Sequence, residues 1–197
     1  QKSIYFITGQ NKISLKNSPL LEMYEKKDIE VLILDDEIDE IIITGVPKYD
    51  EKELKSVNRS GATEDFSDER DKDSEKSLKP VLKKMKKLLG DKVKDVKIST
   101  RLSDSPSCIV VDENDPTSQM QEMMRSMGQM DMPDVKPILE INPNHDIVVK
   151  LKEKTRQKAF NDIALLLFEQ ALIQEGVKLD DPSGFVDRLN NVIADTL

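Results

Sequence analysis

The pattern of apolar and polar positions divides the chain into two parts. In the first, residues 3–8 and 30–34 are continuous runs of mostly apolar, β-branched and aromatic side chains, which is typical of parallel strands covered on both faces. Between them, the Asn-Ser-Pro of residues 17–19 begins a predicted helix. A strand, a helix and a strand at this spacing predict a βαβ unit. We expect a further helix at 36–43 and an edge strand at 54–57.

The second part opens with apolar side chains spaced as on one face of a helix, from Leu78 to Leu89, closed by Gly90. Alternating or apolar runs at 93–99, 108–111 and 138–141 then predict three strands. Helices are expected at 117–127, from Asn142 onward, and in the last forty residues. Strands followed by helices predict an α+β domain.

Between these parts lies a polar and acidic stretch, residues 58–76. Its segment from Glu64 to Glu75 carries seven acids against two bases, a net charge of −5. Such a stretch buries too little apolar surface to offset the entropy lost on ordering, which predicts a linker or a solvated bridging helix. We therefore place the domains at 1–74 and 75–197.

The last forty residues predict a two-helix hairpin with more apolar surface than two helices can cover alone. Gly176 occupies the position after the first helix, and Asp181-Pro182 supplies an N-cap followed by proline at the first helical position. A second copy of the hairpin would cover this surface in a two-fold symmetric, intermolecular four-helix bundle. The alternative is that both helices pack on their own domain.

The apolar positions of this hairpin are the predicted homodimer interface. On the first helix they are Ile163, Leu167 and Leu172, and on the second they are Phe185, Leu189, Val192 and Ile193.

A methionine-rich segment is the candidate for binding other proteins. Six methionines fall between Met120 and Met132, and helical spacing places four of them on one stripe: Met120, Met123, Met124 and Met127. Methionine is flexible and polarizable, so that surfaces rich in it accept apolar partners of varied shape. The alternative is a stripe buried in the core of its own domain.

Composition narrows the range of partners and compartments. A net charge of −8 argues against nucleic acid as the main partner, and no apolar run approaches the length of a membrane span. The single cysteine, Cys108, forms no internal disulfide and suits a reducing cytoplasm. Gln1 without an initiator methionine, followed at once by a strand pattern, suggests a piece of a longer protein.

Other candidate chemistry has plainer explanations. Asp35 and Asp36 follow an apolar strand, where a receiver-like or nucleotide-binding enzyme places Mg²⁺ ligands, but Asp36 as the N-cap of the next helix is favoured. A single histidine, His145, excludes a usual zinc site and a Ser-His-Asp triad. Lysines on the helix that opens the second domain favour a solvated face over a membrane or calmodulin site: Lys79, Lys83, Lys84, Lys86 and Lys87.

Five stretches in order along nearly the whole chain resemble the heat shock protein 90 chaperone family, in its bacterial form. They read QKSIYFITG, SPLLEMYEKKDIEVLILDDEIDE, LLGDKVKDVKISTRLSDSPSCIVVDE, ILEINPNHDIVVKL and ALIQEGVKLDDPSGFVDRLNNVI. The resemblance implies that residues 1–74 end the middle domain of the family and that residues 75–197 form its C-terminal dimerisation domain. It also implies that the methionine helix is the mobile amphipathic helix of the family, which helps to bind unfolded clients.

The resemblance implies further that ATP and Mg²⁺ bind in an N-terminal domain outside this chain. We therefore expect no cofactor here and no enzymatic activity of the chain alone. The chain departs from the family at Ile41, Ile42 and Ile43, where bacterial members often carry an aromatic residue. It ends without the MEEVD tail of eukaryotic members, so that tetratricopeptide co-chaperones are not expected.

The leading hypothesis is thus a homodimeric chaperone fragment that binds unfolded clients. The alternatives are a Mg²⁺-dependent module built on Asp35 and Asp36, and a passive dimerisation scaffold.

Overall fold

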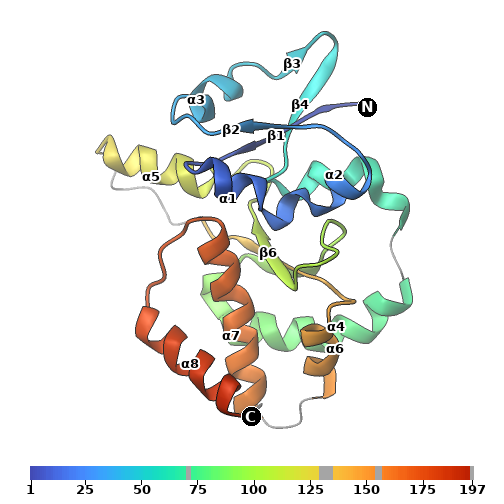
Figure 1. Cartoon of the computed structure of the whole chain (residues 1–197), viewed down its shortest axis with the longest axis vertical. Coiled ribbons are helices and arrows are strands. Elements are labelled where there is room, and N and C mark those ends of the chain that lie inside the picture. Colours follow the sequence, from blue (N-terminus) through green and yellow to red (C-terminus); the bar gives the residue numbers. More distant parts are fainter. Residues whose placement is uncertain (70–71, 129–134, 154–156, 196–197) are drawn as a thin grey trace.

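The fold is described from a computed structural model that places residues 1–69, 72–128, 135–153 and 157–195. These residues form two small sheets, one in each half of the chain, with helices packed around them (Figure 1). The fold is therefore mixed α and β, in agreement with the sequence pattern. None of the helices within these ranges combines the length and apolar character needed to cross a membrane.

The first sheet has four strands, in the order β2 (Val31–Leu34), β1 (Ile4–Thr8), β4 (Lys52–Ser56) and β3 (Lys48–Tyr49). β1 runs parallel to both of its neighbours, and β3 forms an antiparallel hairpin with β4. The strand predicted at 54–57 exists as β4, but its edge position was wrong because β3 takes the edge. A strand of two residues is too short for apolar alternation to reveal.

Short helices connect β1 to β2 and pack beneath the sheet in Figure 1: α1 (Lys12–Lys16), the 3₁₀ helix η1 (Pro19–Leu21) and α2 (Glu22–Lys26). Ser18 caps η1 by accepting a hydrogen bond from the Leu20 backbone N–H at 3.3 Å. This confirms the predicted helix start at Ser18-Pro19. The connection buries Leu20 and Tyr24 against Tyr5 and Ile7 of β1, which holds β1 and β2 in their parallel pairing.

The helix predicted at 36–43 is α3 (Asp39–Thr44), which begins three residues later. The prediction that Asp36 caps this helix was wrong. The N-cap is Ile38, without a side-chain hydrogen bond, and instead the Asp39 carboxylate accepts a hydrogen bond from the Asp36 backbone N–H at 3.1 Å. Gly45 is the C-cap of the helix.

The first half of the predicted linker is ordered and packed. It forms the 3₁₀ helix η2 (Ser60–Glu69), in which Ala62 and Thr63 are buried. The Tyr24 hydroxyl donates to the Ala62 carbonyl at 3.2 Å, and the Phe66 ring meets the Tyr24 ring edge to face at 6.0 Å. Its two apolar residues, Ala62 and Phe66, are enough to hold the segment in place, because Tyr5 and Tyr24 of the first half contact them. Residues 70–71 lie outside the described ranges.

The second sheet has three strands, in the order β5 (Asp95–Ile98), β7 (Ile138–Ile141) and β6 (Ser107–Val110). β5 is parallel and β6 antiparallel to β7, and all three strand predictions are confirmed. The helices of this half are α4 (Lys72–Leu89), η3 (Gly90–Lys92), α5 (Ser118–Ser126), α6 (Asp146–Glu153), α7 (Gln157–Gln174) and α8 (Pro182–Ala194). Met85, Leu139, Val148 and Phe168 join α4, β7, α6 and α7 in one core.

The lysines of α4 serve partly as structural contacts. The Lys84 ammonium lies 3.8 Å from the centroid of the Phe160 ring, and Lys86 donates to the Val93 carbonyl at 2.7 Å. Lys83 and Lys87 are exposed, in agreement with a solvated face.

The two halves of the chain share a core. Tyr5 and Ile7 of the first sheet belong to the same buried cluster as Cys108 and Val110 of β6 and Ile138 of β7. A backbone bridge between Arg59 and Val111 adds a direct link. The two halves are therefore in contact through residues that are distant in sequence, which the polar composition around residues 58–69 did not indicate.

Candidate functional site

The methionine-rich segment forms α5, a helix with no buried residue. Thr117 caps it, as its hydroxyl accepts a hydrogen bond from the Met120 backbone N–H at 3.1 Å, and Gly128 ends it with a φ of +89°. Met127 is 67% exposed, while Met120, Met123 and Met124 are half-buried. The predicted stripe thus lies at the surface rather than in a core. Met130 and Met132 fall outside the described residues.

A second apolar row lies on and beside α3. Ile38, Ile41 and Ile42 are 53%, 40% and 55% exposed. The Thr117 hydroxyl donates to the Glu40 carboxylate, which links α3 to the residue that caps α5. We call these two rows together the α3–α5 surface: Ile38, Ile41, Ile42, Met120, Met123, Met124 and Met127. The sequence pointed only to its α5 part, since residues 40 and 117 are far apart in the chain.

The terminal hairpin presents a third apolar surface, mainly on α8. This helix has no buried residue, and Val186, Leu189 and Ile193 are 50%, 39% and 48% exposed. Phe185 and Val192 are half-buried. The N-cap prediction is confirmed, because the Asp181 carboxylate accepts a hydrogen bond from the Gly184 backbone N–H at 2.9 Å.

On α7, the predicted interface residues divide between the core and the surface. Leu167 is 2% exposed and belongs to the core of its own chain, whereas Ile163 and Leu172 are half-buried at the margin of that core. A bidentate ion pair between Arg188 and Glu169 holds α8 against α7. The surface left for a partner is therefore the outer row of α8 with the margin of α7.

Buried charge lies where the two halves meet, at residues that the sequence analysis did not single out. Arg101 is 1% exposed and pairs with Glu140 of β7, with 3.0 Å between Nε and Oε2. Its guanidinium also donates to the Val57 carbonyl at 2.6 Å and to the Arg59 carbonyl at 3.1 Å. One side chain thus binds the second sheet to the chain segment that follows β4. An arginine in a polar loop carries no sequence signal for burial.

A carboxyl group with a shifted pKa sits at the same junction. Glu175, just after α7, accepts a hydrogen bond from the Asn58 side-chain amide at 3.2 Å. Burial raises the pKa of Glu175 to about 7, against the opposing effects of the Asn58 hydrogen bond and the Arg101 charge. This group therefore changes its charge near neutral pH. The nearby Cys108 thiol is buried, and burial raises its pKa well above the usual value, which makes it unreactive.

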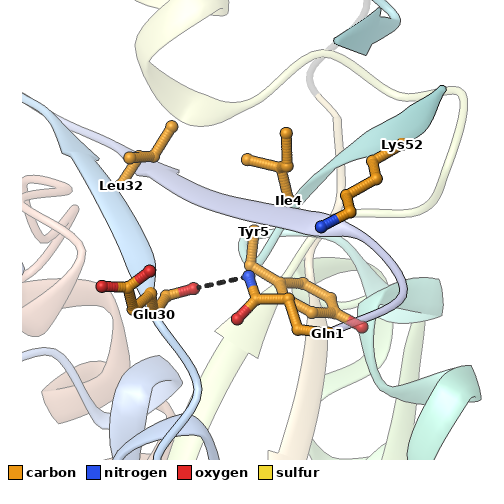
Figure 2. Close-up of a pocket in the computed structure, with 6 residues that line it drawn as sticks. All are labelled: Gln1, Ile4, Tyr5, Glu30, Leu32 and Lys52. Atoms are coloured by element: carbon orange, nitrogen blue, oxygen red, sulfur yellow. Dashed lines mark hydrogen bonds between the residues drawn. The ribbon is translucent and has the colours of Figure 1, made fainter. Parts of the chain in front are cut away.

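The first sheet carries a shallow pocket of about 290 Å³ at its end. In Figure 2, Ile4 and Leu32 project from one side of the sheet and the Tyr5 ring from the other, while the Gln1 amide donates to the Glu30 carbonyl at 3.2 Å. The lining lies on both sides of the sheet, so that it does not converge on one reacting atom.

The other candidate residues for chemistry, Asp35, Asp36 and His145, do not form a site together. Asp35 and Asp36 have no third ligand, because no group of three or more His, Cys, Asp or Glu side chains within the described ranges is placed to hold a metal ion. His145 precedes α6, where its Nδ1 accepts a hydrogen bond from the Ile147 backbone N–H at 3.2 Å. The predicted helix start at Asn142 was therefore too early, and His145 has a structural role.

Comparison with known proteins identifies the family. The family model described as Hsp90 protein matches residues 1–197. The chaperone protein HtpG of Treponema denticola is 51% identical over 197 residues, which cover 98% of this chain and 31% of that protein. HtpG of Ruthia magnifica is 46% identical over 196 residues and HtpG of Treponema pallidum 44% over 198 residues, with the same coverage. The chain thus spans about a third of the length of these relatives.

These matches correct three expectations. From the sequence we expected a chaperone fragment without the ATP-binding part, with no cofactor and with no enzymatic activity. The family match extends over all of residues 1–197, and the relatives are HtpG chaperones. The matches therefore give no ground for separating this chain from the ATP-dependent function of the family. The exclusion of ATP, Mg²⁺ and ATPase activity, which placed the ATP-binding domain of the family outside this chain, was wrong because the family match covers the whole chain.

The matched residues include all five stretches in which the resemblance was found, and each of the three relatives covers nearly the whole chain. The chain belongs to the heat shock protein 90 family.

Proposed function

We propose that this chain acts within a homodimeric molecular chaperone that binds unfolded segments of client proteins. The observation that carries the proposal is the α3–α5 surface, where three isoleucines and Met127 are exposed and three further methionines are half-buried, on helices joined through Glu40 and Thr117. Exposed apolar rows of this kind mark interaction sites. The family of the chain supports the same role, since its relatives are named chaperones.

Within this function, residues 1–74 would correspond to the end of the middle domain of the family and residues 75–197 to its dimerisation domain. The order of elements supports this division, because residues 75–197 contain the α7–α8 hairpin and α8 exposes an apolar row. The buried, free Cys108 fits a reducing cytoplasm.

The chemistry of the α3–α5 surface suits partners without fixed structure. Methionine side chains adapt to irregular apolar shapes, and the three isoleucines offer a firmer row beside them. The side chains of α5 include none that is fully buried, so that the helix can adjust its position at little cost in core packing. An unfolded segment would gain apolar burial there without matching one defined shape.

The test is suppression of the aggregation of a chemically denatured protein, measured by light scattering. We expect Met123→Ser/Met124→Ser and Ile41→Ser/Ile42→Ser to weaken suppression several-fold, because each removes apolar contact area. Ile13→Ser is the matched control, since Ile13 on α1 is 74% exposed and lies outside the surface. Each protein is measured with and without MgATP, because nucleotide binding is not excluded.

Equal suppression by the wild type and by both double variants would contradict the α3–α5 surface as the client site. A loss of suppression with Ile13→Ser as large as that of the double variants would show a nonspecific effect of exposed apolar area.

A further inference from the structure

The segment that leads into α3 is strongly acidic. Five of the six residues from 35 to 40 are acids, and no lysine or arginine occurs from residue 28 to residue 47. Asp36 and Glu37 are exposed, and Asp35 and Asp39 are half-buried. The segment therefore places a concentrated negative charge beside the isoleucine row of the α3–α5 surface.

The part of the chain that the structure describes supplies no counter-charge at ion-pair distance from these acids. Among the described residues, none of the carboxylates from 35 to 40 takes part in an ion pair. Glu40 is 5% exposed, and while one of its oxygens accepts from Thr117, the other has no hydrogen-bond partner within the described part of the chain. By contrast, Asp112 and Asp115, in the loop before α5, are both paired with Lys94.

Acidic and apolar side chains alternate in one short stretch. Ile38 lies between Glu37 and Asp39, and Ile41 and Ile42 follow directly after Glu40. Ile38, Ile41 and Ile42 are spaced as on one face of a helix. A segment that covers these isoleucines must therefore place its own flanking residues next to several carboxylates.

We propose that the α3–α5 surface selects unfolded segments in which lysine or arginine flanks apolar side chains, and disfavours segments flanked by acids. The inference rests on the proposed client-binding function and adds the chemical class of the segment. Opposite charges across a surface favour one partner, and like charges suppress another, more than they raise total affinity.

The probes are three fluorescent peptides that share one apolar core and carry lysine, glutamine or glutamate at both ends. Their binding is measured by anisotropy with the full chain. We expect the lysine peptide to bind about three- to tenfold more tightly than the glutamine peptide, because each exposed pair contributes modestly. The glutamate peptide binds more weakly than both. Added salt narrows these differences, because it screens exposed charges.

Two variants with the same change in net charge separate a local effect from a general one. Asp35→Asn/Asp36→Asn/Glu37→Gln removes the charge beside the isoleucines and keeps the side-chain size. Glu25→Gln/Glu51→Gln/Glu53→Gln removes three exposed acids of the same half elsewhere. We expect the first variant to lose most of the preference for lysine over glutamate, with the glutamine peptide bound as before, and the second to keep the preference.

The outcomes distinguish the selectivity from the function beneath it. Equal binding of all three peptides, or a preference that the first variant retains, overturns the charge selectivity while client binding stands. If Ile41→Ser/Ile42→Ser and Met123→Ser/Met124→Ser leave binding of the glutamine peptide unchanged, or no peptide binds, the proposed surface fails and the selectivity fails with it.

Discussion

Glu175 is a carboxyl group whose ionisation opposes folding near neutral pH. It lies where the end of α7 meets Asn58, and burial raises its pKa to about 7. In the unfolded chain the group titrates near its ordinary value of about 4.3. Between these two values the folded state holds a proton that the unfolded state has released. Its contribution to stability is therefore complete below the unfolded pKa and falls as the pH rises to the folded pKa.

We predict that the Glu175→Gln variant is more stable than the wild type at pH 8, by about 1–3 kcal/mol, and not more stable at pH 4.5. Glutamine keeps an oxygen that accepts from Asn58 but carries no charge to bury. Urea denaturation across this pH range measures the difference. The control is Glu25→Gln on the exposed face of α2, which should parallel the wild type. A difference between Glu175→Gln and the wild type that does not grow with pH would refute the assignment.

At the scale of the element, α8 carries an apolar row that is exposed in the described part of the chain. Val186, Leu189 and Ile193 stay at least 39% exposed, although the helix is fastened to α7 by Arg188 and Glu169. A two-fold assembly would cover such a row with the same surface of a second copy. Because Leu167 faces the core of its own chain, the dimer would depend on α8 and the margin of α7.

We predict that the chain sediments as a dimer and that Leu189→Asp weakens the dimer at least about 100-fold, because a charge would be buried in an apolar interface. Sedimentation equilibrium over a wide concentration range measures this. Val149→Asp is the matched control, since Val149 on α6 is 41% exposed, close to the 39% of Leu189. A monomeric wild type, or a dimer that Leu189→Asp leaves intact, would show that the row has another purpose.

At the scale of the whole molecule, the two sheets are coupled by packing and by one buried cation. Side chains of β1, β6 and β7 share a core, and Arg101 links Glu140 to the carbonyls of Val57 and Arg59. Removing one partner of a buried ion pair leaves an uncompensated charge and costs about 3–5 kcal/mol. The loss should lower the stability of both halves, because Arg101 contacts residues of both.

We predict that urea unfolds the chain in one transition and that Arg101→Met lowers its midpoint for both halves together. Two probes separate the halves, since all three tyrosines lie in the first half and most of the helix lies in the second. Tyrosine fluorescence and circular dichroism should give coincident curves. The control is Arg101→Met/Glu140→Leu, which removes both charges and should cost less than Arg101→Met alone. A tyrosine transition at lower urea would show that the first half unfolds separately.

The sequence by itself determined the elements whose signal is local. The three strands of the second sheet, the methionine helix and the hairpin with its Asp181 cap are all present where periodicity and capping predicted them. Apolar spacing and caps act within a few residues, so that one chain segment contains the whole signal. The family was visible from the same stretches.

Only the tertiary structure decided how these elements meet. It joined α3 to α5 through Glu40 and Thr117 and buried Arg101 between the halves. It also placed Leu167 in the core of its own chain instead of at an interface. It also packed the acidic segment after Asn58 as η2, where composition indicated a linker. Each of these outcomes depends on residues that are distant in sequence, and the burial of a polar side chain follows from the partners that folding brings to it.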